Sequence, residues 1–294
     1  MSREKRKKLA GEKVVCNGQA ADIALTMEKE RLKKLEELQE TNKLLKSGSN
    51  QEFSRFENRV KRVMKQISGT EERVTANIND LLRIFNDPSC PVSISIATLA
   101  KKMVSSNGTL ANPYACSYVV VYVTSKFPQA MDVLLAEFHR ACVYTIPRND
   151  DDDTAIHSSD YYERIDSVMR LYGALVQTDV GENIHGIDHG WAWLARFLNK
   201  TQPHNKATAT ALNAFLRSAG FGLHRRYRCQ FLKLMSVVRE HFLAKLIAEK
   251  DDCSGLQTIV SDITAYLDDR MYLEEPQGRS MRKNHLRSRD ITGF

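Results

Sequence analysis

Apolar side chains recur at steps of three and four residues through most of the chain, and most regularly between residues 185 and 242. Three successive stretches there have the period of an amphipathic helix, and both tryptophans lie in the first of them. Asp188 is expected to cap the first helix, and Gly220 and Gly222 are expected to end the second. The inward positions are predicted to be Trp191, Leu194, Ala195 and Leu198, then Leu212, Phe215, Leu216 and Ala219, and finally Tyr227, Phe231, Leu234, Met235, Val238 and Phe242. Because three such helices need one another to remove their apolar faces from water, this region is predicted to be the centre of an all-helical domain.

The same period continues on both sides of this region. A Ser-Gly-Thr break at residues 68–70 is expected to separate two helices, and Asn112 followed by Pro113 is typical of a helix start. The segment SYVVVYVT (117–124) has the composition of a strand but no second strand to pair with, so it is predicted to be a buried helix. About ten helices from residue 51 onward, joined mostly by short loops, predict an all-α fold of stacked antiparallel helix pairs.

Composition divides the chain into four segments. Residues 1–21 begin with a basic cluster and are predicted to be a disordered arm or a nuclear import signal. Residues 22–48 are rich in Glu, Lys and Leu and are predicted to be a charged helix, with a coiled-coil stub as the alternative, ending in a hinge at KSGSN. Residues 49–270 form the predicted helical domain, which carries an exposed loop at the four aspartates 150–153. Residues 271–294 are predicted to be a basic, disordered tail.

Charge is distributed unevenly along the chain. The stretch 1–65 contains 17 Lys or Arg against 10 Asp or Glu, so it carries the whole formal excess of +7, and the stretch 66–294 is balanced. No apolar run is long enough to cross a bilayer, and no secretory signal is recognisable at the start, so no membrane insertion is expected. The six cysteines lack a C-x-x-C spacing and are predicted to be reduced thiols in a cytosolic or nuclear compartment.

Catalytic signatures are not recognisable in the sequence. There is no strand-Gly-helix phosphate loop, no G-x-S-x-G and no cysteine in a nucleophile motif, so the chain is predicted not to be an enzyme. His185 and His189 near Asp188 suggest a metal site, but His185 is expected to precede the helix and His189 to face elsewhere. Histidines that complete helix ends or pack on the tryptophans are the favoured interpretation.

A basic set on three predicted helices is the candidate binding site. Cations from neighbouring helices that converge suit a polyphosphate or an acidic protein surface, whereas cations on solvated outer faces would bind nothing. The candidate residues are Arg59, Lys61, Lys65, Lys101, Lys102 and Arg140.

Several segments resemble the carboxy-terminal domain of the Gle-one nucleoporin family. HGIDHGWAWLARFLN, preceded by MRLYGALVQ and followed by RYRCQFLKLM, carries the strongest likeness, and HRACVYTIP is similar to the family's His-Lys-Lys-Cys-Pro-Tyr segment. The resemblance covers residues 53–267 and is strongest over 169–235. It implies a HEAT/MIF4G-like right-handed solenoid that resembles the middle domain of translation initiation scaffolds.

The resemblance also implies a function. Family members are non-catalytic mRNA export factors at the cytoplasmic face of the nuclear pore, where an FG nucleoporin anchors them. They bind a DEAD-box RNA helicase and stimulate its ATPase cycle and its release of RNA and nucleotide, and translation factors are further partners. The competing hypothesis is a direct RNA-binding or translation-initiation scaffold that uses the basic termini.

In fungal members, a basic pocket holds inositol hexakisphosphate, which tethers the helicase. Lys101 matches a pocket lysine, Arg140 matches the first of two paired lysines, and one of Arg59, Lys61 or Lys65 matches the lysines of the first helix. The sequence departs from the family pattern at three positions: Ala141 replaces the second paired lysine, Glu137 replaces an arginine, and Ser105 replaces a histidine. No cofactor is expected to be required, and inositol hexakisphosphate is expected to bind weakly or not at all.

Overall fold

The computed structural model describes residues 3–48, 53–105, 112–148, 158–203, 205–248 and 255–281, with side chains described from residue 22 onward. Twelve α-helices and no strand occur in these ranges, which confirms the all-α prediction. The helices are α1 (Arg3–Gly48), α2 (Ser54–Lys65), α3 (Glu71–Phe85), α4 (Val92–Val104), α5 (Pro113–Lys126), α6 (Gln129–Ala141), α7 (Ser159–Val176), α8 (Ile187–Lys200), α9 (Lys206–Tyr227), α10 (Cys229–Val237), α11 (Ala244–Ala248) and α12 (Leu256–Asp268). None of them combines the length and apolar character needed to span a bilayer, within the residues described.

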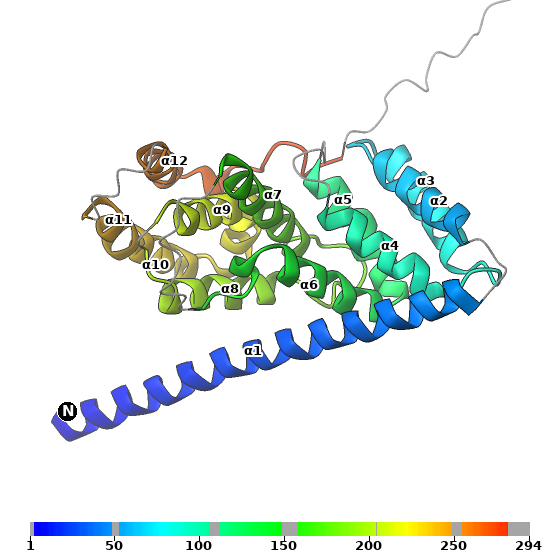
Figure 1. Cartoon of the computed structure of the whole chain (residues 1–294). Helices are drawn as coiled ribbons and strands as arrows, with labels where there is room; N and C mark the ends of the chain where they lie inside the picture. The colour runs from blue at the N-terminus through cyan, green and yellow to red at the C-terminus, as the bar shows by residue number, and fades with distance from the viewer. Residues whose placement is uncertain are drawn as a thin grey trace, which may run out of the picture.

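The helices from α2 onward stack in chain order into two layers. In one layer α3 packs on α5, α5 on α7, α7 on α9, and α9 on α12; in the other α2 packs on α4 and α4 on α6. Figure 1 shows this order running from α2 and α3 at the right to α10–α12 at the left. From α2 to α9, contacts between every second helix are typical of antiparallel pairs stacked into a HEAT-like solenoid, and one continuous apolar core runs between the layers.

Helix α1 lies along the outside of the α4–α6 layer. It has 46 residues, so it is about 70 Å long. Both views show it as a straight helix beside the domain, where it contacts α4 and α6. The helix begins at Arg3, whereas the sequence predicted an irregular arm before residue 22; Ser49 and Asn50 of the predicted hinge lie outside the described residues.

The valine-rich helix is confirmed. Helix α5 starts where Asn112 accepts hydrogen bonds from the backbone N–H groups of Tyr114 and Ala115, with Pro113 at the first helical position. It is buried on almost every side because it lies between α3 and α7 and also contacts α6. The strand-like composition of residues 117–124 therefore results from the burial of α5 on nearly all of its sides.

The first of the three central helices is rotated relative to the prediction. Its N-cap is Gly186, and Asp188 lies in its first turn, where it accepts a hydrogen bond from the Tyr227 hydroxyl. Trp191 is only half-buried and stacks on Tyr227 with ring centroids 4.2 Å apart. The inward face consists of Gly190, Trp193, Leu194 and Phe197.

The two glycines predicted to end the second central helix lie inside it. Helix α9 continues past both of them and ends at Tyr227, where Arg228 takes a positive φ of 47°. Gly220 is needed for close packing instead, because a Cβ there would collide with the hydroxyl of Tyr266 on α12. That hydroxyl donates a 3.0 Å hydrogen bond to the Leu216 carbonyl, so it cannot move freely.

Substituting Gly220 with alanine is therefore expected to destabilise the protein by about 1–3 kcal/mol, the usual cost of overpacking a core. Urea unfolding monitored by circular dichroism measures this change. Gly48→Ala is the matched control, since a Cβ at Gly48 meets no atom within 4 Å. Equal stability of the two variants would contradict the proposed packing role.

Part of the predicted tail is ordered against the domain. Residues 271–281 are described: Tyr272 is buried beside Phe231, and Arg279 donates a 3.2 Å hydrogen bond to the Gln177 side chain. The predicted start of a disordered tail at residue 271 was thus too early. Residues 282–294 and the aspartates 150–153 lie outside the described residues.

Candidate functional site

A basic pocket of about 860 Å³ lies where α1, α2, α4 and α6 meet. Helices α2, α4 and α6 supply its floor through the layer packing described above, and α1 forms its outer wall. Six cationic side chains line it: Lys43, Lys46, Lys61, Lys101, Lys102 and Arg140. Against them stand two carboxylates, Glu57 and Glu137, so six positive charges and two negative ones leave a formal excess of +4.

Four of the six predicted site residues line this pocket. Lys61, from α2, joins Lys101 and Lys102 from α4 and Arg140 from α6. The other two, Arg59 and Lys65, do not line it. Arg59 is displaced by about 200° around α2 from Lys61, and Lys65 lies one turn further along the helix.

Lys43 and Lys46 were missed by sequence reasoning. The Glu-, Lys- and Leu-rich composition suggested a coiled-coil stub in this segment, yet Leu44 is among the most exposed apolar side chains described. The stripe that α1 buries includes Glu28, Leu35 and Asn42, which are spaced by seven residues. Two of these three are polar, so an apolar pattern could not reveal the docked face.

Each carboxylate of the pocket is paired with one of its cations. Glu57 forms an ion pair with Lys46, and Glu137, which is buried, pairs with Arg140. An anionic ligand must therefore compete with two internal carboxylates for two of the six cations. The pocket therefore attracts anions, but the charges of Lys46 and Arg140 are partly neutralised by their carboxylate partners.

The three departures from the family pattern all lie at this site. Ser105 and Glu137 line the basic pocket, and both also line an adjoining hollow of about 280 Å³ together with Ala141. Arg164 of α7 lines this second hollow as well. Ala141 and Glu137, the two charge-changing departures that the resemblance implies, therefore lie where an anion would bind.

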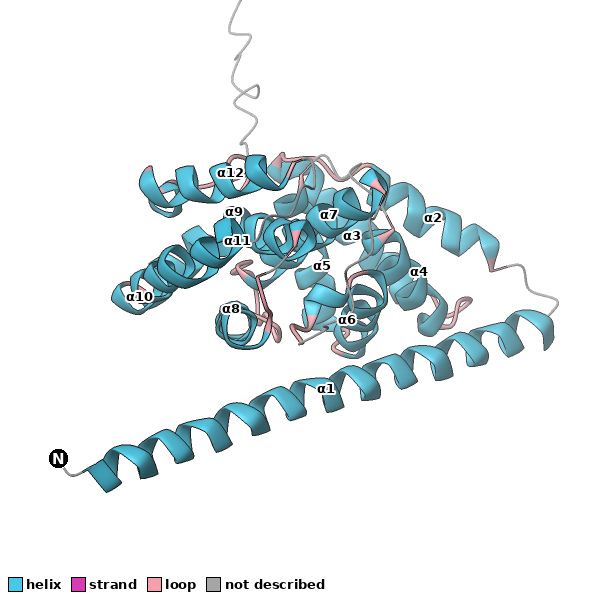
Figure 2. Ribbon diagram, turned by 60° about the vertical axis from the view of Figure 1, so that its left-hand side comes forward, coloured by secondary structure: helices cyan, strands magenta, loops and turns pink. Residues whose placement is uncertain are grey.

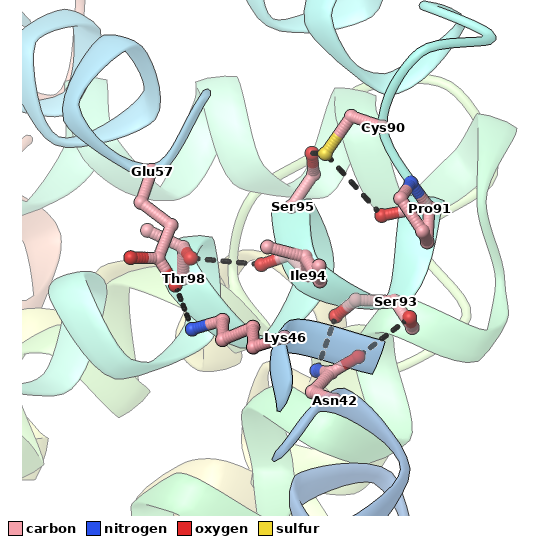
Figure 3. A network of polar contacts seen from close by, with 9 residues as sticks. All are labelled: Asn42, Lys46, Glu57, Cys90, Pro91, Ser93, Ile94, Ser95 and Thr98. Carbon is pink, nitrogen blue, oxygen red and sulfur yellow. Dashed lines mark hydrogen bonds and ion pairs between the residues drawn. The ribbon is translucent and has the colours of Figure 1, made fainter. Parts of the chain in front are cut away.

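A network of polar contacts holds α1 beside the pocket (Figure 3). The Asn42 side chain donates to the Ser93 carbonyl at 3.1 Å and accepts from the Ser93 hydroxyl at 2.6 Å. On the other side, the Lys46–Glu57 ion pair joins α1 to α2. These contacts position Lys43 and Lys46 at the edge of the pocket.

The two histidines suggested as metal ligands are part of an aromatic cluster. His185 precedes α8 and is buried, and its Nε2 lies 3.2 Å from the Tyr172 hydroxyl. Its ring packs against that of His189 with centroids 4.2 Å apart, so the two do not face different ways as predicted. Burial lowers the pKa of His185 well below its usual value. No group of three or more metal-binding side chains occurs among the residues described.

Comparison with known proteins identifies the family. The family model described as GLE1-like protein matches residues 28–239. The chain belongs to this family. The Arabidopsis thaliana relative named mRNA export factor GLE1 is 60% identical over 276 residues, which are 92% of this chain and 45% of that protein. The Danio rerio relative of the same name is 28% identical over 169 residues, 49% of this chain and 24% of that protein. This GLE1-like chain therefore spans less than half the length of both relatives.

A solved structure has the same fold. A chain of the structure described as the S. cerevisiae Dbp5 C-terminal domain bound to Gle1 and IP6 matches with a TM-score of 0.67. The match covers 87% of this GLE1-like chain and 97% of that chain at 14% sequence identity. At this identity the likeness demonstrates a shared fold, and it confirms the architecture predicted from the family resemblance.

Proposed function

We propose that this chain is a non-catalytic mRNA export factor that binds a DEAD-box RNA helicase and stimulates its ATPase cycle. The observation that carries the proposal is the basic pocket, built on a fold shared with a structure of a Dbp5 domain bound to Gle1 and IP6. Membership of the GLE1-like family and 60% identity to an mRNA export factor support it. The site of action would be the cytoplasmic face of the nuclear pore, with an FG nucleoporin as anchor and translation factors as further partners.

An activator of this kind needs no catalytic group of its own. It accelerates the cycle by binding more tightly to a helicase conformation in which RNA and nucleotide are held weakly, and so it speeds their release. Lys61, Lys101 and Arg140 would contact acidic residues of the helicase, either directly or through a bridging polyphosphate.

The test is an RNA-dependent ATPase assay of the mRNA-export DEAD-box helicase with and without the full chain. We expect Lys61→Gln, Lys101→Gln and Arg140→Gln together to reduce the stimulation by about tenfold or more, since each charge-assisted hydrogen bond contributes ~1.5–3 kcal/mol. Arg59→Gln with Lys65→Gln is the matched control, because these two cations lie outside the pocket. Equal loss in both variants, or no stimulation by the wild-type chain, would refute the proposal.

A direct RNA-binding scaffold is the second candidate, favoured by the excess positive charge of the stretch 1–65. Neutralising the basic residues at positions 3–8 should abolish RNA binding if this candidate is correct. The same change should leave the helicase stimulation intact if the chain is an activator. Filter binding and the ATPase assay on one variant therefore separate the two functions.

Inositol hexakisphosphate is proposed as a weak ligand of the same pocket. Lys43 and Lys46 supply positive charge that offsets the absence of a lysine at Ala141. Glu137, however, lies among the cations and forms an ion pair with Arg140. Glu137→Gln keeps the shape of the side chain and is expected to raise the affinity about tenfold, because it removes a repelling charge and frees Arg140. Calorimetry at physiological ionic strength measures this, with the exposed Glu182→Gln as the control. Submicromolar binding by the wild-type chain would contradict the prediction.

A further inference from the structure

We infer that Lys43 and Lys46 of α1 are binding residues of the basic pocket, so that polyphosphate binding and the docking of α1 stabilise each other. This inference rests on the proposed function, because it concerns the same pocket and ligand. Helix α1 supplies two of the six pocket cations and forms one wall. The complete site therefore exists only while α1 lies against α4 and α6.

Helix α1 is attached to the domain by polar groups and by a narrow apolar stripe, in which Leu32 and Leu38 are partly buried beside Leu35. Leu35 is its only large apolar side chain that is fully buried among residues 22–48, whereas α4 alone buries Ile94, Ile96, Leu99 and Met103. A wall with so little buried apolar surface can separate from the domain without opening the core.

Ion pairs fasten α1 at three places along its length. Arg148 donates to the buried Glu28 at 2.9 Å. Asp132 of α6 accepts from Arg31 at 3.3 Å and from Lys34 at 2.8 Å. The third place is the Lys46–Glu57 pair at the pocket itself. Contacts of this kind weaken as salt is added, so the docking is adjustable by charge.

The charge of the pocket opposes docking while the pocket is empty. Lys43 and Lys46 bring positive charge toward Lys61, Lys101 and Lys102, and only two carboxylates offset them. A polyphosphate reverses this effect, because one dense anion attracts both walls at once. Thermodynamic linkage requires the converse as well: whatever undocks α1 must weaken the ligand by the same factor.

Asp132→Lys separates this linkage from ordinary electrostatics. Asp132 is partly exposed and does not line the pocket, and its loss removes the partner of Arg31 and Lys34. The new lysine adds positive charge to the domain, so long-range attraction alone would strengthen binding of an anion. A weaker affinity can then arise only through undocking of α1.

The experiment measures inositol hexakisphosphate binding by calorimetry, and hydrogen exchange of residues 22–48 by mass spectrometry, on the full chain. In the wild-type chain, saturating ligand should slow exchange across these residues. Asp132→Lys should speed exchange there and weaken binding about tenfold, and adding Lys34→Asp should restore both. Lys43→Gln with Lys46→Gln should weaken binding about tenfold or more, whereas Lys29→Gln with Lys33→Gln, outside the pocket, should not.

Two outcomes would overturn the inference, and they are distinguishable. Binding that leaves exchange in residues 22–48 unchanged, or that is as tight in Asp132→Lys, excludes the coupling but leaves the polyphosphate site intact. No binding by the wild-type chain or by Glu137→Gln at millimolar ligand removes the polyphosphate site and the coupling together. The ATPase assay then shows whether direct contact with the helicase survives.

Discussion

Replacing Trp193 with alanine is expected to lower the free energy of unfolding by about 3–5 kcal/mol, the largest effect of any single substitution considered. The side chain is 1% exposed, and its ring lies 4.0 Å from that of Phe215 and 4.8 Å from that of Phe197, centroid to centroid. Its Nε1 also donates a 2.8 Å hydrogen bond to the Tyr144 carbonyl. Truncation leaves a cavity and a buried carbonyl without its donor, so the cost should lie toward the upper end of this range.

Trp191→Ala provides the matched comparison on the same helix. Trp191 is half-buried at the edge of the core, where it stacks on Tyr227, so its loss should cost less, about 1 kcal/mol, as for one aromatic pair. Urea unfolding of both variants, followed by circular dichroism, measures the difference. Equal destabilisation by the two substitutions would mean that the buried face of α8 has been assigned incorrectly.

The sequence predicted the existence of α8 but not its rotation. Both Trp191 and Trp193 have apolar residues three or four positions further along the chain. Either tryptophan could therefore belong to the buried face of the helix. Which of them turns inward depends on the Tyr144 carbonyl, which is 49 residues away from Trp193 and needs a donor. Periodicity identifies helices reliably, but a distant partner decides which side of a doubly apolar helix is buried.

The same limit applies to the binding site. Lys61, Lys101, Lys102 and Arg140 could be found from sequence because each lies on the polar side of a clearly amphipathic or apolar helix. Lys43 and Lys46 could not, because their helix docks through polar pairs whose partners are far away. Arg148 is 120 residues from Glu28, and Ser93 is 51 residues from Asn42. A charged helix with such contacts has the same pattern as one surrounded by water.

Lowering the pH from 7 to 5 is expected to destabilise the domain by about 2 kcal/mol or more, because two buried histidines resist protonation in the folded state. Burial, with the nearby positive charges of Arg31 and Arg148 acting in the same direction, lowers the pKa of His139 to about 3. Burial likewise lowers the pKa of His185, with His189 adding to the effect. Both side chains are at most 7% exposed, so solvent does little to relieve the cost of charging them.

Hydrogen bonding explains why His139 remains neutral. The Thr145 hydroxyl donates its only hydrogen to the Cys142 carbonyl at 2.8 Å, so it must accept from Nδ1 of His139, 3.0 Å away. The proton is therefore on Nδ1, and Nε2 has no hydrogen-bonding partner among the residues described. Protonation would place a buried N–H at Nε2 with nothing to accept it.

The sign of the pH effect follows from linkage. The unfolded chain takes up protons on these histidines below about pH 6.5, whereas the folded chain does not, so acid favours unfolding. At pH 5 His139 contributes about 2 kcal/mol, because pH 5 lies 1.5 pH units below its unfolded-state pKa and each unit corresponds to ~1.36 kcal/mol. His185 adds to the loss in the same direction. The full stability is present above pH 6.5 and is lost progressively as the pH falls toward the folded-state pKa values.

Urea unfolding at pH 7, 6 and 5 tests this origin. His139→Gln removes one of the two titrating groups, so the loss of stability between pH 7 and pH 5 should shrink by about 2 kcal/mol, whatever the variant's stability at pH 7. His241→Gln, at an exposed position in the π-helix Val238–Leu243, should leave the loss unchanged. A wild-type stability that stays constant from pH 7 to pH 5 would contradict the prediction, since two buried neutral histidines cannot be charged without cost. If His139→Gln loses as much stability between pH 7 and pH 5 as the wild-type chain, other groups must take up the protons.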